Sequence, residues 1–355
     1  MSRSAVEFVE VDGSEGEGGG QILRSAVAFS AIQRLPVRVV NIRAGREVPG
    51  LKRQHATVLR ILATVFGGQL TGATEGSREV TFAPGGDRRG QLSVDMGTAA
   101  SITLVLQAVI PAVALTGSGL ILELVGGTDV PWSPTFDYFD RVVREGYRSI
   151  GIRFDAKAQR RGYFPRGGGR VTATVEPCDS VLPVASSEPT SVAGATVLSR
   201  CGGLPGHVAE RQLSSASRVL LWAGMKVEAT EIVAEPVDSP GSSILVYHCG
   251  SGVCIGGDAI GAKGKPAEEV GKAAAARFLG EAGSGAMIDS NLADMLLPLL
   301  SLAPEPSLVT VPSVTQHLKS GMSLAEKFTG CTWSPRKSNG GFEVRVKPSP
   351  NRKRV

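Results

Sequence analysis

The sequence has few of the residues and patterns that mark several common protein classes. Aromatic residues make up 5% of the 355 residues, and the five cysteines form no CxxC pair. Scattered cysteines in odd number argue against a disulfide framework or a zinc site and favour a reducing compartment, so we expect a cytoplasmic protein. No Ser-His-Asp, HExxH or paired Cys/His spacing occurs, which leaves hydrolase and metalloprotease functions without support.

Long hydrophobic runs are also missing. The longest apolar stretch, Ile102–Leu115, contains Gln107 and Pro111 and is too short to span a bilayer. No basic segment followed by an apolar one opens the chain, as a secretory leader would require. We therefore expect a soluble intracellular protein with no membrane partner.

Glycine, by contrast, is abundant, with 45 residues against a usual share of about 7%. Hydrophobic residues at 42% and charged residues at 20% are typical of a globular chain. The net charge of +5 is compatible with a polyanionic partner but does not establish one.

The same order of elements recurs three times along the chain. Each copy has a helix, a strand, a loop, a second helix and a closing hairpin, with first helices at about 20–33, 99–114 and 289–302. This pattern predicts βαβαββ units in an α/β layered architecture. We expect one large domain of three such units, formed by residues 1–181 and 281–355, with a smaller α/β domain inserted at 182–280.

A glycine-rich stretch, "DGSEGEGGGQILRSA" at residues 12–26, precedes the first helix. A simple glycine turn accounts for most clusters of this kind. However, Gly18–Gly20 would leave free backbone N–H groups at a helix N-terminus, and Arg24 lies one turn further on. Glu17 beside an anion indicates a divalent metal between them, because Mg²⁺ is held by one or two carboxylates plus substrate phosphates.

Basic residues gather in "NIRAGREVPGLKRQH", which holds Arg43, Arg46 and His55. A solvated charge run is the ordinary explanation. The loop follows a strand, where α/β folds place ligands, so a phosphorylated or polyanionic substrate explains it better.

One of the four histidines, His317, lies at a strand-to-helix junction in "VPSVTQHLKSG". A histidine there is more often a cap or a hydrogen-bond donor. Next to an anion site, it is also well placed to be a nucleophile.

Taken together, the motifs resemble those of the RNA 3'-terminal phosphate cyclase family, in order and spacing, over nearly the whole chain. The resemblance rests on "DGSEGEGGGQILRSA", "IRAGREVPGLKRQH", "GTAASITLVLQ", "GGTDVPWSP", "RGYFPRGGG" and the His317 segment. That family has three βαβαββ units and one inserted α/β domain.

The resemblance implies ATP-dependent conversion of an RNA 3'-phosphate into a 2',3'-cyclic phosphate. His317 matches the histidine that forms a covalent adduct with AMP, Glu17 the metal ligand for Mg²⁺ or Mn²⁺, and Arg24 and Arg43 the phosphate ligands. The implied ATP contacts are Gly18, Gly19, Gly20, Gln107, Pro134 and the segment Asn291, Leu292, Ala293, Asp294 and Met295. Within this segment the family more often has an aromatic residue at the position of Asn291 and a glutamine at that of Met295. The loss of an aromatic face weakens adenine stacking by roughly 1 kcal/mol.

Three other functions are compatible with parts of the sequence. A cyclase-like ribosome-assembly factor shares the fold but lacks the nucleophilic histidine. An enolpyruvyl transferase is built from similar units but needs no nucleotide site. A plain RNA-binding role suits the basic tail "KPSPNRKRV" but leaves Glu17 unexplained. The sequence leaves the oligomeric state open, with a homodimer as one option.

Overall fold

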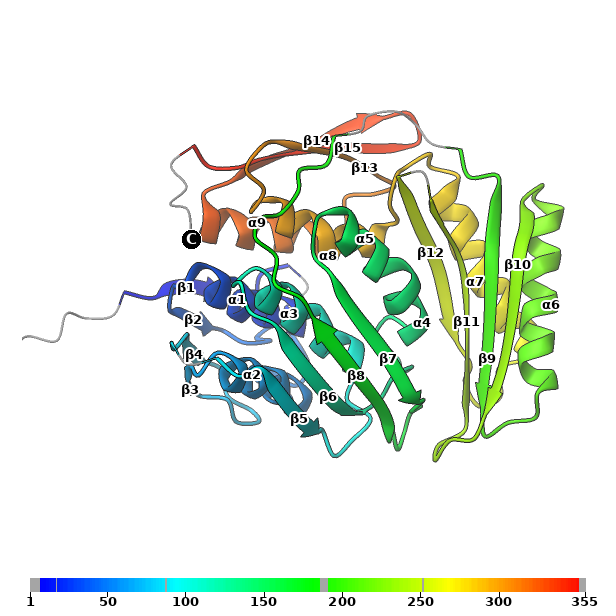
Figure 1. The fold of residues 1–355 in the computed structure, drawn as a ribbon, viewed down its shortest axis with the longest axis horizontal. Coiled ribbons are helices and arrows are strands. Elements are labelled where there is room, and N and C mark those ends of the chain that lie inside the picture. The colour runs from blue at the N-terminus through cyan, green and yellow to red at the C-terminus, as the bar shows by residue number, and fades with distance from the viewer. Residues whose placement is uncertain (1–6, 17, 87, 186–190, 251, 351–355) are drawn as a thin grey trace, which may run out of the picture.

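A computed structural model describes residues 7–16, 18–86, 88–185, 191–250 and 252–350 of the protein (Figure 1). The chain forms a mixed α/β structure with several sheets and helices, which confirms the predicted fold class. Four helices lie in the middle of the molecule, between the sheets (Figure 1): α1 (Gly20–Gln33), α3 (Ile102–Ala114), α8 (Ser290–Leu300) and α9 (Gln316–Thr329). Among the described helices, none is long and apolar enough to cross a membrane.

The N-terminal part of the chain forms a four-stranded sheet with two helices. The strand order is β1-β2-β4-β3, with β1 parallel to β2 and the other pairs antiparallel. Its elements are β1 (Val9–Asp12), α1 (Gly20–Gln33), β2 (Val37–Val40), α2 (Arg53–Val65), β3 (Gln69–Thr71) and β4 (Val80–Ala83).

The next part repeats this arrangement. Its strand order, β5-β6-β8-β7, has the same parallel and antiparallel pairs in the same places. Its second helix is interrupted by one π-helical turn, η1. The elements are β5 (Gln91–Asp95), α3 (Ile102–Ala114), β6 (Leu120–Gly126), α4 (Phe136–Tyr138), η1 (Phe139–Val143), α5 (Arg144–Ser149), β7 (Phe154–Arg160) and β8 (Gly169–Val175).

The C-terminal part has a three-stranded sheet of order β13-β15-β14. A parallel bridge joins Ala185 to Leu308, which brings the chain before the inserted segment alongside β13. The number of repeat units stays a prediction. The elements are α8 (Ser290–Leu300), β13 (Ser307–Val311), α9 (Gln316–Thr329), β14 (Thr332–Ser338) and β15 (Gly341–Lys347).

The segment between Ala185 and α8 forms its own sheet, of order β10-β9-β11-β12, with two helices. A separate hydrophobic cluster holds it together, with Val197, Leu220 and Phe278 fully buried. The division of the chain at residues 182–280 stays a prediction. The elements are β9 (Gly194–Gly202), α6 (His207–Trp222), β10 (Lys226–Glu235), β11 (Gly241–Gly250), β12 (Val253–Ile260) and α7 (Ala267–Ala282).

The cysteine pattern argues against a disulfide framework, but the structure contains one disulfide. Cys249 and Cys254 form a disulfide with a Cα–Cα distance of 4.1 Å. The register of β11 and β12 sets the two residues directly opposite each other on antiparallel strands. Sequence spacing does not reveal this register, which is why the pairing was missed. The other three cysteines are free and buried.

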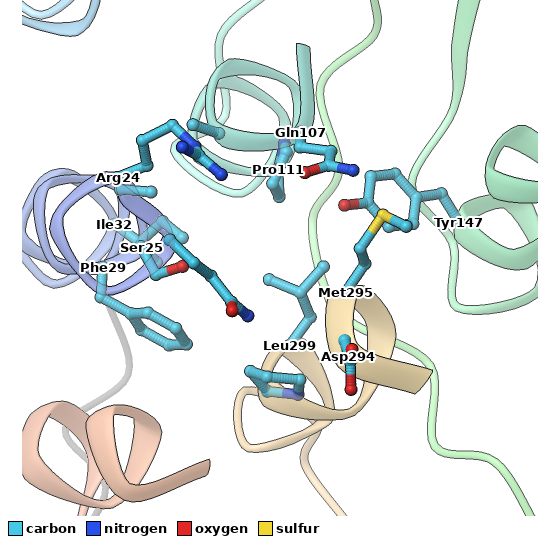
Figure 2. Close-up of a pocket in the computed structure, with 14 residues that line it drawn as sticks. Arg24, Ser25, Phe29, Ile32, Gln107, Pro111, Tyr147, Asp294, Met295 and Leu299 are labelled. Carbon is cyan, nitrogen blue, oxygen red and sulfur yellow. The ribbon is translucent and has the colours of Figure 1, made fainter. Parts of the chain in front are cut away.

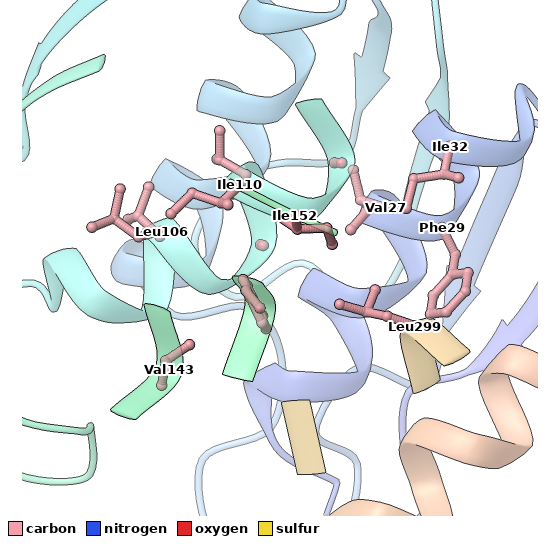
Figure 3. Packing of buried hydrophobic residues seen from close by; sticks show 14 of the residues in the cluster. Val27, Phe29, Ile32, Leu106, Ile110, Val143, Ile152 and Leu299 are labelled. Carbon is pink, nitrogen blue, oxygen red and sulfur yellow. The ribbon is translucent and has the colours of Figure 1, made fainter. Parts of the chain in front are cut away.

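The central helices are fixed by the main hydrophobic core (Figure 3). The long apolar stretch of the sequence is α3, a core helix whose Leu106 and Ile110 are fully buried. Val27 on α1 is also fully buried, and α1 and α3 pack together. Fully burying an aliphatic side chain stabilises the folded state by about 1.5–3 kcal/mol. The packing of α1 against α3 therefore fixes the positions of both helices and of the polar side chains they carry.

Candidate functional site

A pocket opens among the central helices (Figure 2). Four predicted site residues from distant parts of the sequence line it: Arg24 on α1, Gln107 on α3, and Asp294 and Met295 on α8. The other lining residues are Gln21, Ser25, Ala28, Phe29, Ile32, Ala108, Pro111, Tyr147, Pro298 and Leu299. The pocket thus has apolar walls and a few convergent polar groups, as small-molecule sites do.

The glycine-rich loop leads into the first turn of α1. Gly18 has a φ of +56°, a left-handed conformation that favours glycine. Gly19 is the N-cap of α1 and provides no side-chain cap. A Cβ on Gly20 would lie 2.2 Å from Nε2 of His55 and 2.9 Å from Nη1 of Arg24. A larger residue would therefore force these two side chains to shift, and the N-cap Gly19 has no side chain to accept from the first-turn amides.

A cluster of basic side chains surrounds this helix end. Burial lowers the pKa of Arg24 to about 10 and also lowers the pKa of Arg43, where Arg46 adds to the effect. Within the described part of the chain, no carboxylate forms an ion pair with Arg24 or Arg43. Desolvation and the charges of Arg24, Arg43 and Lys52 lower the pKa of His55 to about 3.

Two polar atoms in this cluster are buried without a hydrogen-bond partner in the described structure. They are Nδ1 of His55, a residue 4% exposed, and Nε of Arg43. Buried polar groups are nearly always satisfied, and buried charges are normally paired. An anion bound here would satisfy both needs, so the residues present fit a phosphate group.

The predicted nucleophile, His317, lies beside the same helix end. It is half-buried in the first turn of α9, and Nε2 of Gln21 donates to its backbone oxygen at 3.5 Å. Thr315, the N-cap of α9, accepts a hydrogen bond from the Leu318 amide at 2.8 Å and donates one to Asp294. The N-termini of α1 and α9 therefore meet at the basic cluster, and Asp294 links His317's turn to the pocket.

The segment Asn291–Met295 shows two different environments along α8. Asn291, Asp294 and Met295 are half-buried at i, i+3 and i+4 positions on one helix face. Leu292 and Ala293 are fully buried in the hydrophobic core. Their direct contact with a ligand stays a prediction.

The last predicted adenine contact, Pro134, is held near Gln107. The backbone oxygen of Pro134 accepts a hydrogen bond from Oγ1 of Thr103 at 3.0 Å. Thr103 lies on α3, four residues before Gln107. The loop that contains Pro134 is therefore attached one helical turn, about 6 Å, from the pocket.

The predicted metal ligand, Glu17, lies outside the described residues. No group of three or more His, Cys, Asp or Glu side chains in the described ranges is arranged to hold a metal ion. The metal therefore stays a prediction.

Sequence reasoning missed some residues of this site. Gln21 is three residues before Arg24 on the same helix, a spacing that could have revealed it. The sequence marks His55 only as one member of the basic loop, yet its imidazole lies against Gly20 at the centre of the basic cluster. Tyr147 reaches the pocket from α5, and no pattern in the sequence points to it.

Comparisons with known proteins agree with this arrangement of motifs. The family described as "RNA 3'-terminal phosphate cyclase" matches residues 15–334. A protein named RNA 3'-terminal phosphate cyclase from Pyrococcus furiosus is 41% identical over 323 residues, which are 91% of this chain and 94% of the relative. Proteins with the same name from Desulfurococcus amylolyticus and Caldivirga maquilingensis are 41% and 39% identical, covering 91% and 96% of this chain and 92% and 98% of the relatives.

Among solved structures, the enolpyruvyl transferase NikO from Streptomyces tendae matches 96% of this chain and 66% of its own. The identity is 14% and the TM-score 0.27, so the match carries no argument about fold or function.

Proposed function

Because the chain belongs to the RNA 3'-terminal phosphate cyclase family, we propose that it converts an RNA 3'-phosphate into a 2',3'-cyclic phosphate, with ATP consumed to AMP and pyrophosphate. One observation carries the proposal beyond the family assignment. The first turns of α1 and α9 are in contact through Gln21 and the backbone of His317, next to a basic cluster with unsatisfied buried polar atoms.

The reaction would proceed in three transfers at phosphorus. An imidazole nitrogen of His317 attacks the α-phosphorus of ATP, so that a P–N bond forms and the bond to pyrophosphate breaks. An oxygen of the RNA 3'-phosphate then attacks the same phosphorus and breaks the P–N bond. Finally the neighbouring 2'-oxygen, losing its proton, attacks the 3'-phosphorus and expels AMP.

The residues of the basic cluster would bind and orient the phosphates. Arg24 and Arg43, with the amides at Gly18–Gly20, would stabilise the charge that develops on the transferring group. Arg24 and His55 both lie against Gly20, so Arg24 would already be held beside the helix end before phosphate binds. The last step is intramolecular, so proximity would supply much of its rate.

The pocket itself would hold the nucleoside of ATP. Gln107 would offer a polar contact and Met295 an apolar one, since both line the pocket, and Asp294 accepts a hydrogen bond from Thr315 in the turn that carries His317. Asn291, on the half-buried face of α8, and Pro134, attached to α3 through Thr103, would complete the site from beside the pocket. A divalent metal at Glu17 would neutralise phosphate charge when bound.

The test is a cyclisation assay on a single-stranded RNA that ends in a 3'-phosphate. With ATP and Mg²⁺ or Mn²⁺, the terminal phosphate should become resistant to phosphatase. The matched control is the same RNA with a 2'-deoxy terminal nucleotide, which has no nucleophile for the last step and should accumulate as the adenylylated RNA. Phosphate that stays sensitive with both metals would contradict the proposal and favour a non-catalytic RNA-binding role.

A further inference from the structure

Three loops meet at one end of the sheet β5-β6-β8-β7, the lower end in Figure 1. They are residues 96–101 after β5, 127–135 after β6 and 161–168 between β7 and β8. The Gly127 amide donates to the Ala100 oxygen at 2.8 Å, and the Thr128 amide donates to the Gly162 oxygen at 2.8 Å. The loops therefore form one continuous surface. They also carry three of the motifs noted in the sequence.

Trp132, at the tip of the 127–135 loop, has two unusual features. Its side chain is 97% exposed, and its φ is +68°, a left-handed conformation that is rare for a bulky residue. Exposure of an indole to water is unfavourable, and backbone strain of this kind gathers at functional sites. Packing gives no reason for either feature.

The backbone on the C-terminal side of Trp132 is held firmly. The Thr135 amide donates to Oδ2 of Asp258 at 2.8 Å, and the Phe136 amide donates to the buried Asp129 at 3.3 Å. Arg161 forms an ion pair with Asp129 at 3.2 Å. The loop is thus closed on itself and tied to its neighbours, so the indole is presented to solvent from a fixed backbone.

The same surface also carries exposed aromatic and basic side chains. Phe164, on the 161–168 loop, is 63% exposed. Arg166 is exposed and has no ion-pair or hydrogen-bond partner in the described structure. The guanidinium of Arg53 approaches the 96–101 loop, where its Nη2 lies 4.0 Å from the Cβ position of Gly97. Exposed aromatic faces with arginines beside them are the features that bind single-stranded nucleic acid.

The surface is also connected to the pocket. Pro134, two residues after Trp132, is hydrogen-bonded to α3 one turn from Gln107. An RNA whose 3'-phosphate lay at the basic cluster would extend its preceding nucleotides over this connected surface.

We propose that Trp132 is a base-stacking residue for the RNA substrate, and that it stacks on one of the last few nucleotides before the 3'-phosphate. This inference rests on the proposed function and adds the part of the surface that holds the RNA chain. Phe164 would extend the stacking surface, and Arg166 would contact the backbone phosphates.

The chain contains a matched control in Trp222, which is 92% exposed at the end of α6, on a different sheet layer. Fluorescence anisotropy would measure the affinity of wild type, Trp132→Ala, Trp132→Phe and Trp222→Ala for a labelled single-stranded RNA with a 3'-phosphate, at one fixed salt concentration. The same RNA with an abasic site at each of the last four positions in turn would identify the stacked base. Unfolding temperatures of all variants would be recorded alongside.

Trp132→Ala should weaken binding roughly ten-fold or more, which is the range for loss of one base–aromatic stack. Trp132→Phe should recover most of that affinity, and Trp222→Ala should stay within two-fold of wild type. The abasic site at the stacked position should weaken wild type by a similar factor and leave Trp132→Ala unchanged.

The inference would be overturned if Trp132→Ala bound the intact RNA as tightly as wild type does. It would also be overturned if the substitution weakened binding of every abasic RNA by the same factor as binding of the intact RNA. If wild type still cyclises RNA in that case, the proposed function stands and only the stacking residue is refuted. If wild type neither binds nor cyclises RNA with a 3'-phosphate, the proposed function fails and the inference fails with it.

Discussion

Acidification from pH 7 to pH 5 should destabilise the protein through His55. Its pKa is lowered from the ordinary value of 6.5 to about 3 by burial and by the charges of Arg24, Arg43 and Lys52. Because the folded pKa is the lower one, the unfolded chain binds a proton between pH 6.5 and pH 3 that the folded chain does not. Stability from this group is therefore present above the unfolded pKa and is lost as the pH falls through this window.

The magnitude follows from the size of the shift. One pKa unit is worth about 1.4 kcal/mol, and His55 is 4% exposed, so screening by solvent does not reduce the effect strongly. Between pH 7 and pH 5 the lost free energy of unfolding is about 2 kcal/mol. Bound phosphate should oppose this loss, because an anion beside the imidazole favours its protonated form.

Denaturant unfolding at pH 7, 6 and 5 would measure this effect in wild type, His55→Gln and the exposed-site control His207→Gln. Wild type and His207→Gln should lose about 2 kcal/mol more than His55→Gln over this range. The comparison uses the slope against pH, so a general loss of stability in His55→Gln does not disturb it. Equal slopes in all three proteins would refute the account of the basic cluster.

Two further substitutions test the geometry of the site. Gly20→Ala places a Cβ 2.2 Å from Nε2 of His55, so it should cost about 1–3 kcal/mol in unfolding free energy and lower the cyclisation rate sharply. Gly45→Ala is the control, because Gly45 lies in the neighbouring basic loop and has no atom within 4 Å of its Cβ position. It should change neither the unfolding free energy nor the cyclisation rate. Equal effects of Gly20→Ala and Gly45→Ala would contradict the proposed packing. Thr315→Ala removes the N-cap hydrogen bond of α9 and the hydrogen bond to Asp294. It should lower the unfolding free energy by about 1 kcal/mol and slow the covalent labelling of the protein by α-labelled ATP. Thr315→Ser keeps the hydroxyl and should restore both the stability and the labelling rate. Full labelling of the alanine variant would show that this turn does not position His317.

Local patterns predicted the elements that position the site. The first helix was expected at about 20–33 and is Gly20–Gln33, because a glycine run followed by an apolar face defines such a helix locally. The stretch Ile102–Leu115 was identified as too short for a membrane, and it is the core helix that presents Gln107. The fold class followed from the repeated order of these elements.

Features that depend on tertiary contacts were not predictable. The pairing of Cys249 with Cys254 requires the register of two strands, which no spacing rule gives. His55 is central because α2 packs its imidazole against Gly20, more than 30 residues away in sequence. Along α8, the half-buried positions can be distinguished from the fully buried ones only when the neighbouring elements of the helix are known. The exposure of Trp132 likewise follows from the closure of its loop.

The central claim is that this site transfers AMP through His317, and covalent labelling tests it most directly. The protein would be mixed with α-labelled ATP and Mg²⁺ or Mn²⁺ without RNA, then denatured and separated from free nucleotide. Wild type and a His207→Ala control should retain an acid-labile label on the chain, and His317→Ala should retain none. Label that persists in His317→Ala, or no label in wild type with either metal, would contradict the account.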